Sequence, residues 1–192
     1  MNNDEITKVN KQTFDWENWK VEMLSSGSKE RVNSYELIAL TTKLSPGEKN
    51  AAKQCLSESN SYYQSEIKNQ HQIILKSLTP SGGTASTTFD WGSWKKKTVK
   101  QLDNASDKSN EKAVDAVVAK GKTLPPHEQP NFAHLMEKTL VGGFKQLGED
   151  IVHGIVTAAD DVEKGLEDAG KAIGNWATGA AHTVAHFFSS IF

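Results

Sequence analysis

An eight-residue aromatic motif occurs twice in this chain and constrains its fold more than any other feature. The segment Thr13–Lys20 reads Thr-Phe-Asp-Trp-Glu-Asn-Trp-Lys, and Thr88–Lys95 reads Thr-Phe-Asp-Trp-Gly-Ser-Trp-Lys. The two copies hold four of the five tryptophans of the chain, so coincidence is a poor explanation. A duplication of this kind predicts two related modules that follow one another along the chain.

A second pair of matching segments follows the motif. Residues 36–48 match residues 116–128 at an offset of 80, whereas the motif itself recurs at an offset of 75. The second copy therefore holds five extra residues, which we expect in a loop between Val99 and Val114 because loops tolerate insertions.

These matches predict four parts of the chain. They are a first helical module over 1–78, a flexible linker rich in Ser, Thr and Gly over 79–87, a second helical module over 88–142 and a C-terminal amphipathic helix over 143–192.

Both copies have the pattern of helices. Thr13 and Thr88 are expected to cap a helix, which places Asp15 and Asp90 in its first turn. Farther along, apolar residues recur every three to four positions: Ala52, Cys55, Leu56, Tyr63, Ile67, Ile74 and Leu78 in the first copy, and Phe132, Leu135, Met136, Leu140 and Phe144 in the second. Since no stretch alternates with a period of two, the expected fold class is all-α.

The start of the second helix differs between the copies. Ser45-Pro46-Gly47-Glu48 predicts a capping box with proline at the first helical position. Pro125 stands where the first copy has the serine, so the corresponding helix is expected to be capped differently or to begin later, near Glu128.

From Gly143 to Phe192 the sequence predicts one long amphipathic helix. Apolar residues recur about every 3.5 positions over this segment, and the opposite face carries acids and lysines that we expect in solvent. The residues expected to contact a membrane or a partner are Val152, Ile155, Val162, Leu166, Ile173, Trp176, Val184, Phe187, Phe188, Ile191 and Phe192.

The last 21 residues, 172–192, contain no Asp, Glu, Lys or Arg. That length is close to the roughly 20 residues that cross a bilayer, but seven Asn, Thr, His and Ser residues make the segment a marginal inserter at best. Its apolar end must be covered by the body of the protein, another chain or lipid. The same segment has small residues at helical spacing, which allows close approach of helices in an oligomer.

Two sets of residues are candidates for further roles. His182 and His186 are four residues apart and are expected to sense pH by protonation near pH 6, whereas no carboxylate stands within a turn of them to complete a metal site. The aromatic residues of the motif form either the core of each module, which we favour, or a surface for a partner. They are Phe14, Trp16, Trp19, Phe89, Trp91 and Trp94.

Composition and motifs exclude several classes of function. With 22 basic and 24 acidic residues the chain offers nucleic acid no overall attraction, and the Lys95–Lys97 run with Lys100 is expected to be a solvated helix face. The lone Cys55 is expected to be a small buried residue. Because there is no phosphate-binding loop, HExxH or CxxC, we expect neither an enzyme nor a cofactor. The start lacks a basic and apolar leader, which predicts synthesis in the cytosol without a classical signal peptide.

The last fifty residues resemble in character the Gly- and Ala-rich amphipathic helices of membrane-active peptides and helical pore-forming toxins, without a specific motif. The resemblance implies a self-associating, toxin-like or pore-forming protein whose C-terminal helix inserts into or lies on a membrane. In the alternative, the chain is a structural or adaptor protein, viral or phage proteins included, that uses this helix and the tryptophan motifs for assembly with another protein.

Overall fold

The computed structural model describes residues 14–25, 39–78, 89–164 and 168–191. These ranges contain helices and no strand, which confirms the all-α class. The helices are α1 (Trp16–Ser25), α3 (Pro46–Leu78), α4 (Trp91–Gly121), α5 (Gln129–Met136), a π-helical turn (Glu137–Val141), α6 (Gly142–Glu163) and α7 (Ala169–Ser189). Residues 39–42 are also helical. The loop expected between Val99 and Val114 is wrong, because α4 is helical throughout this segment and the extra residues lengthen the helix.

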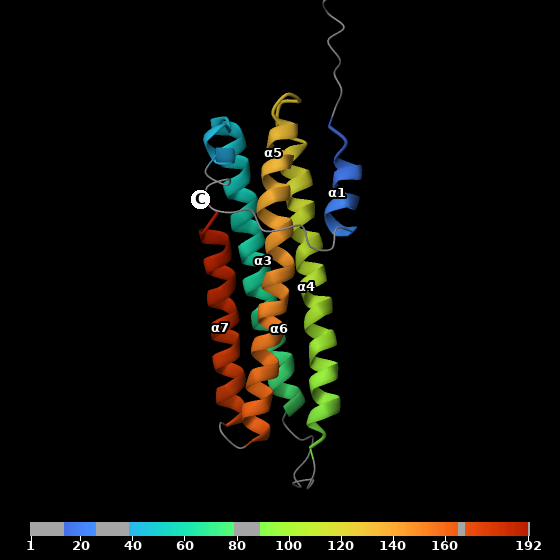
Figure 1. The fold of residues 1–192 in the computed structure, drawn as a ribbon, viewed down its shortest axis with the longest axis vertical. Helices are drawn as coiled ribbons and strands as arrows, with labels where there is room; N and C mark the ends of the chain where they lie inside the picture. The colour runs from blue at the N-terminus through green and yellow to red at the C-terminus, as the bar shows by residue number, and fades with distance from the viewer. Residues whose placement is uncertain (1–13, 26–38, 79–88, 165–167, 192) are drawn as a thin grey trace, which may run out of the picture.

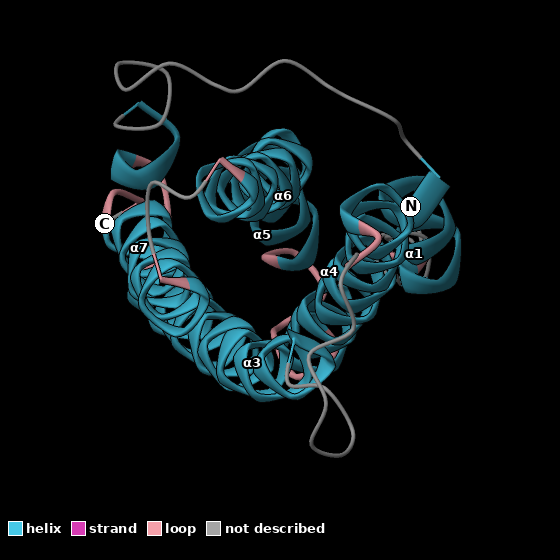
Figure 2. Ribbon diagram, turned by 90° about the horizontal axis from the view of Figure 1, so that it is seen from below, coloured by secondary structure: helices cyan, strands magenta, loops and turns pink. Residues whose placement is uncertain are grey.

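The long helices form an antiparallel bundle (Figure 1). α3 runs down the bundle, α4 returns, α5 and α6 run down again through the π-helical turn, and α7 returns beside α3. Seen end-on, α3 packs between α4 and α7, α6 lies between the same two neighbours on the other side, and α1 packs on the outside of α4 (Figure 2). This is the arrangement of an up-and-down four-helix bundle with one additional short helix.

The helix starts follow the sequence closely. Ser45 and Glu48 form the predicted capping box: the Ser45 amide donates to Glu48 Oε2 at 2.6 Å and the Glu48 amide donates to Ser45 Oγ at 3.1 Å. In the second copy α5 begins at Gln129 after Glu128, which makes no side-chain cap bond, so the predicted later start is confirmed.

The capping residue of the aromatic motif is not the predicted threonine. Asp90 is the N-cap of α4 and its Oδ1 accepts from the Ser93 amide at 3.0 Å, and Asp15 Oδ1 accepts from the Asn18 amide at the same distance. Aspartate is at least as good an N-cap as threonine and carries a charge that the helix dipole favours. Thr13 and Thr88 lie outside the described residues.

The predicted single C-terminal helix is two helices. α6 ends at Glu163 and α7 begins at Ala169, after Asp168, whose Oδ1 accepts from the Lys171 amide at 3.1 Å. Folding back packs the apolar face of α6 on that of α7, which a single rod could not do. The apolar spacing stays near 3.5 across the break, so periodicity alone did not detect it.

One apolar core extends through both predicted modules and the C-terminal segment. Matching positions of the two copies are buried alike: Ala52 and Phe132 are both 0% exposed, and Cys55 and Leu135 are 0% and 1% exposed. The α3–α4 side of this core also holds buried polar side chains, namely Ser59, Gln70, Thr98 and Ser109. A cavity of about 20 Å³ between α3, α4 and α6 has room for about one water.

Candidate functional site

The inner face of α7 lies in the core of the bundle. Six of the predicted contact residues are at most 7% exposed: Ile173, Trp176, Val184, Phe187, Phe188 and Ile191. On α6, Ile155 is buried, and Val152 and Val162 are half-buried. Leu166 and Phe192 lie outside the described residues. The sequence analysis left three possible covers for the apolar end, namely the body of the protein, another chain or lipid. In the structure the body of the protein covers it.

Two side-chain hydrogen bonds attach α7 to its neighbours. Trp176 Nε1 donates to the Ile151 carbonyl of α6 at 2.9 Å, and Gln64 Nε2 of α3 donates to the Ala181 carbonyl at 2.7 Å. Gly154 lets α6 approach the indole closely, since a Cβ there would lie 3.1 Å from Trp176 Cδ1. Apolar side chains also pack across the α7 interface, and this packing is favourable because it removes apolar surface from water.

Aromatic rings close the end of α7. The Phe188 ring lies 5.8 Å from the Tyr63 ring of α3 and 5.0 Å from the Phe187 ring. Burial raises the pKa of the Tyr63 phenol, although a hydrogen bond with Ser106 opposes the shift, so the phenol stays neutral in the bundle. Its hydroxyl donates to Asn110 Oδ1, which joins this end of α7 to α4 through α3.

The outer face of α7 is polar, exposed and uncharged beyond Lys171. His182 and His186 both lie on it, one helical turn apart, and are exposed. In the described ranges no three His, Cys, Asp or Glu side chains gather where they could hold a metal ion. Protonation of the two imidazoles would therefore add charge to the surface of the bundle rather than to its core.

Glycines on this outer face give a testable consequence. A methyl group added at Gly174 or Gly179 would meet no atom within 4 Å. Because alanine is the better helix former by about 1 kcal/mol, Gly174→Ala and Gly179→Ala are each expected to raise the free energy of unfolding by about 0.5–1 kcal/mol in urea denaturation. A loss of stability in either variant would mean that another surface covers this face.

The first aromatic motif is docked into the bundle. Trp16 is 4% exposed, its Nε1 donates to Gln129 Oε1 at 2.9 Å, and its ring lies 6.2 Å from the Phe132 ring. Gly121 at the end of α4 makes room for it, because a Cβ there would overlap the indole. Trp19 is also buried, and Phe14 is partly buried against the core.

The second motif has the same internal geometry in a more open setting. Phe89 and Trp91 meet edge-on at 4.6 Å and 61°, as Phe14 and Trp16 do at 4.7 Å and 63°. Trp94 is 8% exposed and donates to Ser77 Oγ at 2.8 Å, whereas Phe89 is 42% exposed and Trp91 is half-buried. Three of the four tryptophans thus serve the core, and Phe89 reaches the surface.

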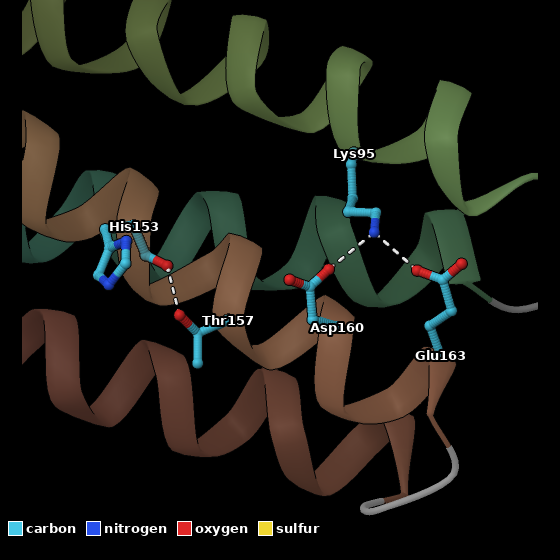
Figure 3. A network of polar contacts seen from close by, with 5 residues as sticks. All are labelled: Lys95, His153, Thr157, Asp160 and Glu163. Atoms are coloured by element: carbon cyan, nitrogen blue, oxygen red, sulfur yellow. Dashed lines mark hydrogen bonds and ion pairs between the residues drawn. The ribbon is translucent and has the colours of Figure 1, made fainter.

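The lysine that ends each motif pairs with a carboxylate on another helix, which the sequence analysis did not foresee. Lys95 Nζ lies 2.7 Å from Asp160 Oδ1 and 2.6 Å from Glu163 Oε2, at the end of α6 (Figure 3). Lys20 Nζ lies 2.5 Å from Asp115 Oδ1 of α4. We expected Lys95, Asp160 and Glu163 on solvated faces. The recurrence of a lysine at the last position of the motif, Lys20 and Lys95, was the sequence signal for a paired side chain.

The Lys95 ion pair has a defined pH range. The hydrogen bond from Lys95 holds the pKa of Asp160 below its usual 3.8, and hydrogen bonds to Asp160 and Glu163 hold the pKa of Lys95 above 10.5. The stabilisation from Asp160 is therefore present above about pH 4 and lost as the pH falls below it, and that from Lys95 is present below about pH 10 and lost above it. Acidification to pH 5 leaves the pair intact.

This predicts that Lys95→Met lowers stability by an equal amount at pH 7 and pH 5, and that its difference from the unmodified chain shrinks as the pH falls below 4. Denaturation midpoints at pH 7, at pH 5 and below pH 4 check the result, with Lys97→Met, at an exposed neighbouring lysine, as the control. A difference that already disappears at pH 5 would contradict the assigned pair.

Among the described helices, none combines the length and the apolar character needed to cross a membrane. No family model, curated protein or solved structure matches this chain.

Proposed function

We propose that this chain is a membrane-active, toxin-like protein without enzymatic activity, in which the α6–α7 hairpin leaves the bundle and lies on or inserts into a lipid membrane. The observation that carries the proposal is α7 itself. It has one apolar face and one polar face, and no charged residue from Ala172 to Ile191. An uncharged two-sided helix can exchange a protein core for the boundary between lipid headgroups and chains.

The energetics of this exchange favour a lipid surface over water. Fully exposing an aliphatic or aromatic side chain costs about 1.5–3 kcal/mol, so exposing the six buried α7 residues named above would cost roughly 10 kcal/mol or more. In water the bundle therefore stays closed. A lipid surface that accepts the same side chains offsets most of that cost. The polar contacts to be broken include the hydrogen bond from Gln64 to the Ala181 carbonyl and the ion pairs of Lys95 with Asp160 and Glu163.

The duplication fits this proposal. We interpret α1 with α3, and α4 with α5, as two related helical modules, and the α6–α7 hairpin as the added C-terminal segment. His182 and His186 would lie on the polar side of the membrane-bound helix, where protonation favours contact with lipid phosphate. Self-association on the membrane belongs to the same proposal, since the outer face of α7 is small and uncharged.

A disulfide between α4 and α6 tests the proposal. A Cβ built at Gly148 lies 3.7 Å from the Ser106 Cβ, which is within the range of disulfides. The double variant Ser106→Cys, Gly148→Cys is expected to lose dye release from liposomes when oxidised, because α6 can no longer leave α4. Reduction should restore release to the level measured for the unmodified chain.

The reduced double variant is its own control, since it differs from the oxidised one by a single bond. The native Cys55 is buried, and burial raises the pKa of its thiol to about 12, so it does not compete for the disulfide. Equal dye release from the oxidised and reduced forms would refute an opening of the bundle between α4 and α6.

The second candidate is assembly with another protein. One observation favours it: α1 is apolar on both sides, with Trp16, Trp19 and Met23 buried and Val21 and Leu24 exposed by 64% and 44%. Two such residues three apart on one short helix offer a docking surface. A concentration-dependent mass in sedimentation equilibrium that Val21→Ser, Leu24→Ser abolishes, together with no dye release, would favour this structural or adaptor function.

A further inference from the structure

The start of α4 carries exposed aromatic and basic side chains together. Phe89 is 42% exposed, Trp91 is half-buried, and Lys96, Lys97 and Lys100 are exposed within the first three turns. We call these five residues the basic aromatic patch. Aromatic rings at headgroup level and lysines on lipid phosphate are the usual contacts of proteins with anionic membranes.

The motif does not need the patch lysines in order to pack into the core of the bundle. In the first copy the positions of Lys96, Lys97 and Lys100 hold Val21, Glu22 and Ser25. That copy docks and is stabilised by its buried tryptophans without any of these lysines. The lysines and the exposed phenylalanine therefore distinguish the second copy, and packing of the motif does not explain them.

The patch lies at the end of the bundle where α6 turns into α7. The N-terminal turns of α4, the last turn of α3, the last turn of α6 and the first turn of α7 share this lower end in Figure 1. Two contacts fix the placement: Trp94 donates to Ser77 near the end of α3, and Lys95 pairs with Asp160 and Glu163 in the last turn of α6. A surface bound by the patch is thus next to the hairpin.

Charge complementarity identifies the occupant. The segment 143–192 holds three lysines and seven acids, so the membrane-active hairpin has a charge of −4 and cannot itself attract an anionic surface. The whole chain has a net charge of −2. Because salt screens charges beyond about 8 Å, the local charge decides the attraction, and here three lysines stand beside the carboxylate of Asp90, which interacts with Lys96.

We propose that the basic aromatic patch binds anionic phospholipid headgroups and brings the α6–α7 end of the bundle to the membrane. This proposal rests on the proposed membrane activity and adds the lipid class and the orientation of approach. Lys96, Lys97 and Lys100 contact headgroup phosphates and carboxylates, while Phe89 enters the interface between headgroups and chains and Trp91, packed against the core, supports it from below.

The test compares two triple variants with the same change in charge. Lys96→Gln, Lys97→Gln, Lys100→Gln removes the patch lysines, and the control removes three exposed lysines from other places on the surface: Lys43→Gln, Lys68→Gln and Lys108→Gln. Binding is measured by co-sedimentation with phosphatidylcholine vesicles, with and without about one quarter phosphatidylserine, and dye release is measured on both.

The unmodified chain should prefer the phosphatidylserine vesicles. The patch variant should bind them roughly a hundredfold more weakly, since each of the three lysines near an anionic surface contributes about fivefold. The control should bind within about twofold of the unmodified chain. Phe89→Ser should weaken binding to both vesicle types.

Four results would overturn the proposal. Equal losses in both triple variants would assign the effect to net charge. Equal binding to both vesicle types, with dye release retained, would remove the lipid preference and leave the proposed function standing. No binding or dye release with either vesicle type would remove both. Binding to polyglutamate through the same lysines, with vesicles ignored, would identify an acidic protein as the partner and would also overturn it.

Discussion

Replacing Trp176 by alanine is expected to lower the free energy of unfolding by about 3–5 kcal/mol, the range for a large buried aromatic side chain. Trp176 is 6% exposed, its indole packs against Gly154 of α6, and its Nε1 donates to the Ile151 carbonyl. The truncation leaves a cavity between α6 and α7 and removes one of the two hydrogen bonds that attach α7. Urea denaturation followed by helical ellipticity measures the change.

Thr178→Ala is the matched control, because Thr178 is exposed on the same helix and its hydroxyl contacts only the Gly174 carbonyl of that helix at 3.0 Å. Its free energy of unfolding should change by less than about 0.5 kcal/mol. A loss below about 1 kcal/mol for Trp176→Ala would contradict the position of α7 in the core.

The same variant discriminates between the two candidate functions. If the α6–α7 hairpin must leave the bundle to act on lipid, a bundle destabilised by Trp176→Ala should open more readily, and dye release from liposomes should become faster. If α7 only completes a structural bundle, Trp176→Ala should lower stability and leave vesicles intact. Opposite directions of stability and activity in one variant are characteristic of a region whose function needs it to move.

Local features of the fold were predictable from short-range sequence patterns. The Ser45–Glu48 capping box and the later start of α5 depend on residues within one turn, so the sequence contains the whole interaction. Helical periodicity likewise predicted the buried positions of α3 and α5, such as Cys55 and Leu135. These features can be predicted without knowing which other helix packs on the one concerned.

The break between α6 and α7 was missed because it depends on long-range packing. A helix continued past Glu163 would keep the same apolar spacing. Folding back is favoured because α7 then covers the apolar face of α6, and that contact cannot be read from the spacing. The local signal for the start of a new helix was Asp168, a good N-cap residue whose side chain accepts from the amide of Lys171, three residues later. The partners of Lys95 were unpredictable for the same reason, since Asp160 and Glu163 lie more than sixty residues away.

The docking of α1 leads to the last expected result. Gly121→Ala places a methyl group in the volume occupied by the Trp16 indole, so the ring must leave its position against Gln129 and Phe132. α1 has ten residues and packs mainly on α4, and an isolated helix of that length is not stable in water. We therefore expect α1 to unfold and its buried tryptophans to become solvated.

The measurement is tryptophan emission together with helical ellipticity. Gly121→Ala should shift the emission to longer wavelength and remove about ten residues of helix, while the rest of the bundle unfolds cooperatively as before. Gly174→Ala is the control, because it is the same chemical change in a helix with open space around the new methyl group. Both variants gain the intrinsic helix preference of alanine, about 1 kcal/mol, so any opposite effect at Gly121 comes from the indole alone. An unshifted emission in Gly121→Ala would mean that α1 does not pack on α4 through Trp16, and the assembly surface proposed for Val21 and Leu24 would lose its support.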